Sequence, residues 1–219
     1  MRPRVTAVSI TEAIADDLRN RLLEGEFSPG AVFPETTVAE MYDVARPTAR
    51  VAIERVVSEG LLERHPHRPA RVPALGVEDV RDIYRSRIFV ESEVLRSLAR
   101  EGTVPAEAER ANADIAATIA KGGSPLEIVE PDMRFHTSLV DAVGSARMSK
   151  IYESLANEVR ACMLQVQGRN LLVSEHIHAE HALILQRIAE NDPDGVAAVL
   201  DDHLTRARDR LSAVLAGGD

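Results

Sequence analysis

The sequence of 219 residues has one cysteine and no tryptophan, and aromatic residues make up only 3% of it. The single cysteine, Cys162, excludes an internal disulfide framework. No run of about 18 apolar residues occurs, so we predict no membrane span. The N-terminal stretch MRPRVTAVSITEAIADDL lacks the apolar core of a signal peptide. We therefore expect a cytoplasmic globular protein.

Lysine is also scarce, with 2 lysines against 24 arginines, and the net charge of −9 is unevenly spread. Residues 1–74 hold 10 basic and 11 acidic side chains, whereas residues 75–219 hold 16 and 24. The overall acidity argues against contact with nucleic acid, but the first segment escapes this argument if its arginines cluster. We predict two domains, at 1–74 and 75–219, with different partners.

The first segment has the pattern of three helices followed by a hairpin. SITE at its start matches a capping box, in which Ser9 caps the helix and Glu12 reaches back. The stretch FSPGAVFPE is a turn-rich break. We predict helices that begin at Ser9 and end near Gly25, at about 37–42 and at about 47–59, then a small hairpin at 61–73. This layout is typical of a winged helix-turn-helix.

The second segment changes to long amphipathic helices from about Val77 onward. Pro131 lies inside the third of them, so we expect a kink or restart near Glu130. The predicted fold is mostly α, with an N-terminal winged helix-turn-helix and a C-terminal antiparallel bundle of about six helices. We place these helices near 78–101, 105–121, 125–143, 146–168, 175–191 and 193–216.

Two arginines stand at the start of the third predicted helix, in the stretch ARPTAR. Its apolar stripe faces inward, which leaves Arg46, Thr48 and Arg50 at the outward end that contacts base edges in a recognition helix. Arginine can bond guanine bidentately, while threonine suits phosphate. Arg68, at the hairpin tip, could reach the DNA backbone or minor groove. The alternative is a three-helix bundle whose arginines are merely solvated.

Four side chains of metal-ligand type interrupt apolar helix faces in the second segment. Asp132 and His136 share one helix face in DMRFH, and His181 and His203 lie on two later helices. A buried Asp costs several kcal/mol if unpaired, and one cation would satisfy all four groups. Three imidazoles and a carboxylate suit Zn²⁺, Ni²⁺, Mn²⁺ or Fe²⁺. The alternative is separate core histidines beside a simple Asp132–His136 pair.

Arg87 and Glu91 fall on one face of the first C-terminal helix, together with Tyr84. They form either a buried i, i+4 ion pair or a site where the fork of Arg87 binds a ligand carboxylate. His176 and His178 are additional histidines, which we interpret as surface or loop residues. Alternatively, His178, three positions before His181, could contact that histidine and support the metal site without binding the metal.

Residues 9–73 resemble the DNA-binding domain of the GntR superfamily of bacterial transcription regulators. The resemblance covers LRNRLLEGEFSPGAVFPETTVAEMYDVARPTARVAIERVVSEGLLERHP. It implies that the core arginines of the family fall at Arg46 and Arg50. Three departures concern the operator sequence and the wing contact rather than the fold: Ala45 replaces the usual Ser, Pro47-Thr48 reverses the usual order, and HPHRPARV lacks the usual wing-tip glycine.

Residues of about 78–216 resemble the FCD ligand-binding domain of FadR-type GntR regulators. The matching motifs are D-x-x-F-H at 132–136, E-H-x-x-I-L at 180–185 and NDPDGVAAVLDDHL at 191–204. The resemblance implies that Asp132, His136, His181 and His203 hold one divalent metal per chain, and that Arg87 lies near an effector cavity. Ser145 stands where the family usually has Asn.

These observations predict a metabolite-responsive transcription regulator, of the repressor type, that binds a palindromic operator in double-stranded DNA as a homodimer. A small carboxylate would enter the helical bundle, coordinate the metal and change the spacing of the DNA-binding heads. We do not expect an enzyme. The alternatives are a metalloenzyme that uses the Asp/His site for hydrolysis with Glu180 as base, and a regulator that senses the metal itself.

Overall fold

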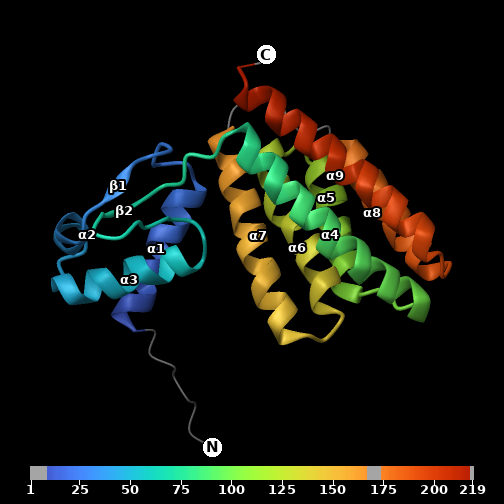
Figure 1. Cartoon of the computed structure of the whole chain (residues 1–219), viewed down its shortest axis with the longest axis horizontal. Coiled ribbons are helices and arrows are strands. Elements are labelled where there is room, and N and C mark those ends of the chain that lie inside the picture. The colour runs from blue at the N-terminus through green and yellow to red at the C-terminus, as the bar shows by residue number, and fades with distance from the viewer. Residues whose placement is uncertain (1–8, 167–173, 218–219) are drawn as a thin grey trace, which may run out of the picture. The chain divides into compact units, whose positions relative to one another are not determined.

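The computed structural model describes residues 9–166 and 174–217, in which the chain forms helices and one small sheet (Figure 1). The chain divides into two compact units, Met1–Ala74 and Leu75–Asp219. The prediction of a mostly α fold is confirmed. Within the described ranges, no helix combines the length and the apolar character needed to cross a membrane.

The first unit is built on three helices and a two-stranded sheet. Helices α1 and α2 both pack against α3, and their apolar faces meet in one core that includes Leu18, Val38 and Ile53. The sheet closes one side of this core through Phe33 and Ala70, which are both buried. The elements are α1 (Ile10–Leu23), β1 (Val32–Phe33), α2 (Glu35–Met41), α3 (Arg46–Ser58) and β2 (Ala70–Arg71).

The starts of α1 and α3 differ in their capping. Ser9 caps α1, because its side-chain oxygen accepts the backbone N–H of Glu12 at 3.2 Å. The carboxylate of Glu12, predicted to reach back to its own cap, accepts from Arg55 of α3 at 2.9 Å and so joins two helices. At the start of α3, Ala45 occupies the cap position and supplies no side-chain bond.

The hairpin predicted at 61–73 forms only in part. Glu63 and Arg71 exchange backbone hydrogen bonds of 2.8 and 2.9 Å, but β2 pairs with β1 in an antiparallel register that joins Phe33 to Ala70. The β1 strand lies in FSPGAVFPE, which the sequence predicts to be only a turn-rich break. At the tip, His67 adopts a φ of +62°, a conformation that usually favours glycine. The tip thus turns without the glycine usual in the family.

The second unit is a bundle in which α4 contacts α6, α7, α8 and α9. Every helix lies within three residues of its predicted range, although the predicted end of the fourth, at 167–168, falls outside the described residues. The largest hydrophobic core of the chain fills this bundle. Its helices are α4 (Val77–Glu101), α5 (Ala106–Ala120), α6 (Pro125–Asp141), α7 (Ala146–Gln165), α8 (Ser174–Ala189) and α9 (Pro193–Leu215).

Two local expectations concern α6 and the start of α7. Helix α6 runs through Pro131 without interruption, so the helix does not restart near Glu130. Ile128 and Phe135, on either side of the proline, are buried and anchor the helix in the core. Ser145 accepts the backbone N–H of Met148 at 3.4 Å. Because Ser and Asn are both good N-cap residues, Ser145 can serve where the family usually has Asn.

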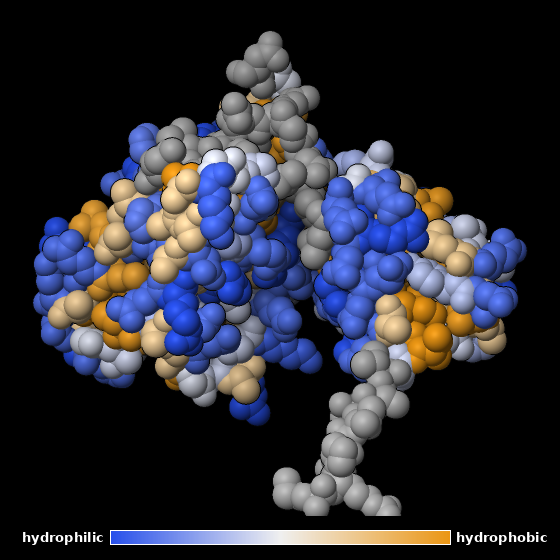
Figure 2. Space-filling model, turned by 180° about the vertical axis from the view of Figure 1, so that it is seen from behind, coloured by the Kyte–Doolittle hydropathy of each residue, from blue (hydrophilic) through white to orange (hydrophobic). Residues whose placement is uncertain are grey.

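The surface of the molecule is mostly hydrophilic on the face shown in Figure 2, where hydrophobic residues form small separate patches. This follows from the helix patterns, because the apolar stripes of each unit are collected in that unit's own core.

We predict that Ala45→Ser stabilises the first unit by about 0.5–2 kcal/mol, since the backbone at Ala45 already has the extended conformation of a cap. Urea unfolding of the full chain, followed through the transition of this unit, measures the effect. The matched change Ser9→Ala removes an existing cap and should destabilise by a similar amount. An unchanged midpoint for Ala45→Ser would show that the cap bond does not form.

Candidate functional sites

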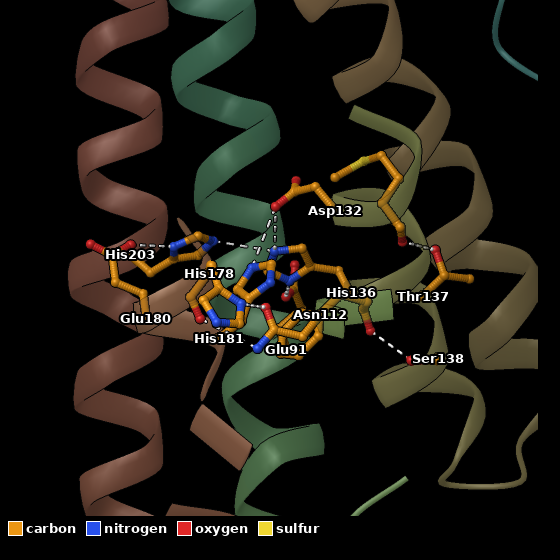
Figure 3. Close-up of polar contacts among 12 residues, drawn as sticks. Glu91, Asn112, Asp132, His136, Thr137, Ser138, His178, Glu180, His181 and His203 are labelled. Atoms are coloured by element: carbon orange, nitrogen blue, oxygen red, sulfur yellow. Dashed lines mark hydrogen bonds and ion pairs between the residues drawn. The ribbon is translucent and has the colours of Figure 1, made fainter. Parts of the chain in front are cut away.

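Four side chains of metal-ligand type converge inside the second unit (Figure 3). Helix α6 supplies Asp132 and His136 from successive turns, α8 supplies His181 and α9 supplies His203. One ligand atom from each lies within 4.8 Å of the others, and all four residues are buried. The residues singled out by sequence therefore come together at one place, as a cluster that could hold a metal ion.

The contacts within the cluster are long, and they share atoms. The Nε2 atoms of His136 and His203 are 3.3 Å apart, and Asp132 Oδ1 lies 3.4 Å from His181 Nε2. The same carboxylate oxygen is 3.9 Å from His136 Nε2. The atoms thus surround a common point rather than pairing off.

Carboxylates behind two of the histidines fix which ring nitrogen faces the cluster. Glu91 Oε2 lies 2.6 Å from His136 Nδ1, and Glu180 Oε2 lies 2.6 Å from His203 Nδ1. A carboxylate can only accept, so each Nδ1 donates its proton outward. Burial lowers the pKa of His136 despite the nearby Glu91, which favours the neutral ring. The Nε2 atoms of the two rings therefore face one another across the cluster, 3.3 Å apart.

His181 has the clearest need for a further partner. Its ring is fully buried and stacks on Phe135, with centroids 3.7 Å apart and planes inclined by 6°. Neither ring nitrogen has a hydrogen-bond partner among the described residues, although buried polar atoms usually have one. Burial lowers the pKa of His181 well below its usual value, so protonation does not relieve this.

A divalent transition metal fits this donor set. A cation between the two facing Nε2 atoms would accept a lone pair from each. Metal–nitrogen bonds of about 2.0–2.1 Å in a tetrahedral site place two imidazole nitrogens roughly 3.3–3.4 Å apart. The separation between His136 and His203 agrees with this spacing. The carboxylate–histidine pairs behind the cluster are also typical of metal sites.

The predicted pairing of Arg87 with Glu91 is present. Arg87 Nε donates to Glu91 Oε1 at 2.8 Å, and both side chains are buried. The hydroxyl of Tyr152, from α7, donates to the same oxygen at 2.6 Å. Sequence reasoning missed Tyr152, because no spacing links it to a residue of α4. Desolvation opposes the charge of Glu91, but Arg87 and His136 outweigh it and hold the pKa of Glu91 well below its usual range.

A small cavity borders the cluster. It measures about 30 Å³ and is lined in part by Tyr84, Arg87, Asp132 and His203. The hydroxyl of Tyr84 and Nη2 of Arg87 are buried without hydrogen-bond partners among the described residues. Such a volume accommodates about one or two water molecules, so a larger molecule requires it to open.

The two additional histidines differ in their positions. His176 is exposed, as expected of a surface residue. It also lines the cavity, which the sequence did not predict. His178 lies 3.1 Å from the side-chain oxygen of Asn112, an interaction that joins α8 to α5. Neither belongs to the cluster of four.

The first unit carries an open groove of about 770 Å³ between the start of α3 and the hairpin tip. Arg46, Arg50, Arg64 and Arg68 all line it. The side chains of Arg46 and Arg50 are 67% and 64% exposed, as base-reading residues need to be. Thr48 is half-buried and does not line the groove, which makes it a weaker candidate.

Glu35 is a residue of this groove that sequence reasoning missed. Its carboxylate lies 3.0 Å from Arg46, 3.8 Å from Arg50 and 3.4 Å from Arg64. Desolvation raises the pKa of Glu35, but the nearby arginines outweigh this effect and lower the pKa below its usual value. It begins α2, and only folding brings it beside the start of α3. One carboxylate thus gathers three arginines on the same face.

A winged helix-turn-helix with an arginine-lined groove, joined to a helical domain with a buried Asp/His cluster, is the architecture of a two-domain DNA-binding regulator. Residues 10–72 match the family model of bacterial regulatory proteins of the gntR family, and residues 82–206 match the FCD domain. The chain belongs to the GntR family and carries an FCD domain. It is a transcription regulator and not an enzyme, so the metalloenzyme alternative is wrong.

Curated relatives agree with this assignment over most of their length. The HTH-type transcriptional regulator YdhC of Bacillus subtilis (strain 168) is 23% identical, across 93% of this chain and 91% of the relative. A probable D-xylose utilization operon transcriptional repressor of Paenarthrobacter nicotinovorans is 22% identical, across 92% and 88%.

Solved structures show the same fold. A GntR-type regulator from Rhodococcus sp. RHA1 superposes with a TM-score of 0.78 at 21% identity, across 95% of this chain and 98% of that one. The metal-free FCD domain of the regulator TM0439 gives a TM-score of 0.55 at 19% identity, across 66% of this chain and 99% of that domain.

Proposed function

We propose that this regulator binds operator DNA through α3 and the hairpin tip, and that a small organic acid, bound beside a divalent metal in the FCD domain, controls this binding. The convergence of Asp132, His136, His181 and His203 within 4.8 Å carries the proposal. A bacterial regulator of this kind acts in the cytoplasm, where the DNA lies. We also propose that it acts as a repressor, as the name of the Paenarthrobacter relative describes that protein.

For DNA recognition, Arg46 and Arg50 are the proposed base-reading residues. They are exposed in the groove and lie at the N-terminal end of α3, the part of a recognition helix that meets base edges. Arg68, at the hairpin tip, is the proposed backbone contact. Thr48, half-buried at the start of α3, could at most reach a phosphate.

We predict that Arg46→Ala or Arg50→Ala weakens binding to the operator by about 1–3 kcal/mol and relaxes base preference. Arg68→Ala should instead weaken specific and random duplexes about equally. Fluorescence anisotropy titrations on an operator and a scrambled duplex at one salt concentration measure both effects. Intact operator affinity in both Arg46→Ala and Arg50→Ala would show that α3 does not read the bases.

For metal binding, we propose that Asp132, His136, His181 and His203 hold one ion per chain, of Zn²⁺, Ni²⁺, Mn²⁺ or Fe²⁺. Two observations support this: the ring nitrogens of His181 have no hydrogen-bond partner among the described residues, and the Nε2 atoms of His136 and His203 face each other. So does the description of the similar TM0439 domain as metal-free, which implies a metal-bound counterpart. Such an ion offers positive charge and open coordination positions to an anionic oxygen.

We predict that the wild-type chain binds roughly one metal ion and that His181→Ala loses most of this metal content. The melting temperature of the metal-loaded protein should also fall, because bound metal stabilises the native state. Elemental analysis and thermal unfolding measure the two effects. His176→Ala is the matched control, since His176 lies on the same helix and lines the cavity outside the cluster. Equal metal loss in both variants would mean that the ligands are chosen wrongly.

For the effector, we propose a small carboxylate that contacts Arg87. Nη2 of Arg87 and the hydroxyl of Tyr84 are buried donors beside the cavity that have no hydrogen-bond partner within the described ranges, and they suit an anionic oxygen. Because the closed cavity measures only about 30 Å³, binding must move its walls. This movement offers a route by which the effector alters DNA binding.

We predict that at least one organic acid raises the melting temperature of the metal-loaded protein and changes operator affinity by about 5–150-fold. The shift should disappear after chelation, and in Arg87→Lys, which keeps the charge but loses the fork. A thermal-shift screen of organic acids tests this. Acids that act equally without metal would contradict a shared site, and operator binding controlled by metal alone would favour the metal-sensing alternative.

We also propose that the protein is a homodimer. Regulators with a winged helix-turn-helix bind two half-sites of a palindromic operator, and two-fold symmetry of the DNA is matched by two-fold symmetry of the protein.

A further inference from the structure

Glu35 is an acidic residue that lines the groove proposed to bind DNA. Its charge repels phosphates, which are the main source of protein–DNA affinity. The residue begins α2 but does not cap it, because Pro34 holds the cap position and the helix has no side-chain cap bond. A carboxylate in the first turn of a helix is favourable in any orientation. Helix stability alone therefore does not explain why this carboxylate contacts the arginines of α3.

The carboxylate of Glu35 meets both proposed base-reading arginines through the same kind of atom. Nε of Arg46 donates to Oε2 at 3.0 Å, and Nε of Arg50 lies 3.8 Å from Oε1. Nη1 and Nη2 of these arginines form no hydrogen bond with any residue that the structure describes. Each guanidinium group is thus held at its inner nitrogen, while its two terminal nitrogens stay free.

Two kinds of DNA atom compete for such terminal nitrogens. Guanine offers O6 and N7 to both of them at once, and this contact carries sequence information. Phosphates accept arginine along the whole duplex and carry no sequence information. A side chain that is tethered at Nε has less freedom to swing toward a phosphate, but it still presents both terminal N–H groups to a base edge.

We propose that Glu35 is a specificity-determining residue of this regulator. Its carboxylate holds Arg46 and Arg50 by Nε, so that their terminal nitrogens meet base edges and stay away from phosphates. Glu35 thereby lowers the affinity for DNA in general and raises the discrimination between sequences, because specificity can come from disfavouring the wrong partners. The inference rests on the proposed role of α3 in DNA recognition and adds the residue that positions its arginines.

The other two arginines of the groove differ in a way that fits this role. Nη1 of Arg64 lies 3.4 Å from Glu35 and donates to Glu54 at 2.6 Å, and the side chain of Arg64 is only 18% exposed. Arg64 therefore helps to hold the carboxylate in place and is too buried to read bases. Arg68 is exposed and has no ion pair among the described residues, which leaves it free for the proposed backbone contact.

Glu35→Gln tests the proposal because it removes the charge and keeps the size of the side chain. On a duplex of arbitrary sequence at physiological salt, the full-length variant should bind about three- to tenfold more tightly than wild type. The slope of log affinity against log salt should also steepen by about 0.9 for each arginine that moves onto a phosphate. Fluorescence anisotropy titrations at several salt concentrations measure both quantities. Tighter binding cannot result from a loss of folding.

Two controls separate this effect from a general change of charge. Glu12→Gln also releases an arginine of α3, since Glu12 accepts from Arg55 at 2.9 Å, but neither residue lines the groove. This variant should bind the arbitrary duplex nearly like wild type. The second control combines Arg46→Ala with Arg50→Ala. On that background, Glu35→Gln should lose its gain in affinity, because the arginines that it releases are absent.

Selection from a library of randomised duplexes tests the discrimination itself. The wild-type chain should enrich G·C pairs at the positions whose preference is lost in Arg46→Ala and Arg50→Ala. Glu35→Gln should flatten the preference at those positions and leave it unchanged elsewhere in the site.

Three results would overturn the proposal: an unchanged base preference in Glu35→Gln, a gain on the arbitrary duplex no larger than that of Glu12→Gln, or a gain that persists without Arg46 and Arg50. If the wild-type chain enriches no sequence, the proposed DNA recognition fails together with the role of Glu35. If the arginine variants lose base preference but Glu35→Gln keeps it, only the role of Glu35 fails.

Discussion

The carboxylate of Glu91 connects the core of the FCD domain to its cluster of possible ligands. One oxygen accepts from Arg87 and Tyr152, and the other faces His136 Nδ1, so residues of α4, α6 and α7 meet at a single buried charge. Removing one partner of a buried ion pair typically costs about 3–5 kcal/mol, because the other charge is left unpaired. The need to satisfy this charge fixes the ring of His136 and directs its Nε2 toward Asp132 and His203.

The other side of the cluster is held differently. Glu180 orients His203 in the same way, but Glu180 is only half-buried and also pairs with the exposed Arg206. The cavity has Arg87 on the α4 side, whereas much of its remaining lining comes from α8 and α9. A site with one wall inside the core and another near the solvent can open on the solvent side without disturbing the first. This asymmetry suits a domain that must admit a ligand.

The sequence alone predicts the helices, because apolar periodicity and glycine or proline punctuation reflect local physics. It also identifies Asp132, His136, His181 and His203, since polar ligand-type residues on apolar faces are conspicuous. What it misses depends on contacts between distant segments. Glu35 meets the arginines of α3 only after folding, and the pairing of β1 with β2 has no local signal. The local DMRFH pattern likewise gives no hint that the carboxylate behind His136 comes from α4, 45 residues earlier.

Helix α4 connects the proposed effector and metal sites to the end of the DNA-binding unit along the chain. Its inner face carries Arg87 and Glu91 beside the cavity and the cluster. It also begins at Val77, only two residues after Leu75, where the second unit starts. A displacement of Arg87 by a bound acid would therefore act on the helix that directly follows the DNA-binding unit in the chain. Two such helices across a two-fold axis would transmit it to both heads together, which is what binding to two half-sites of one operator requires.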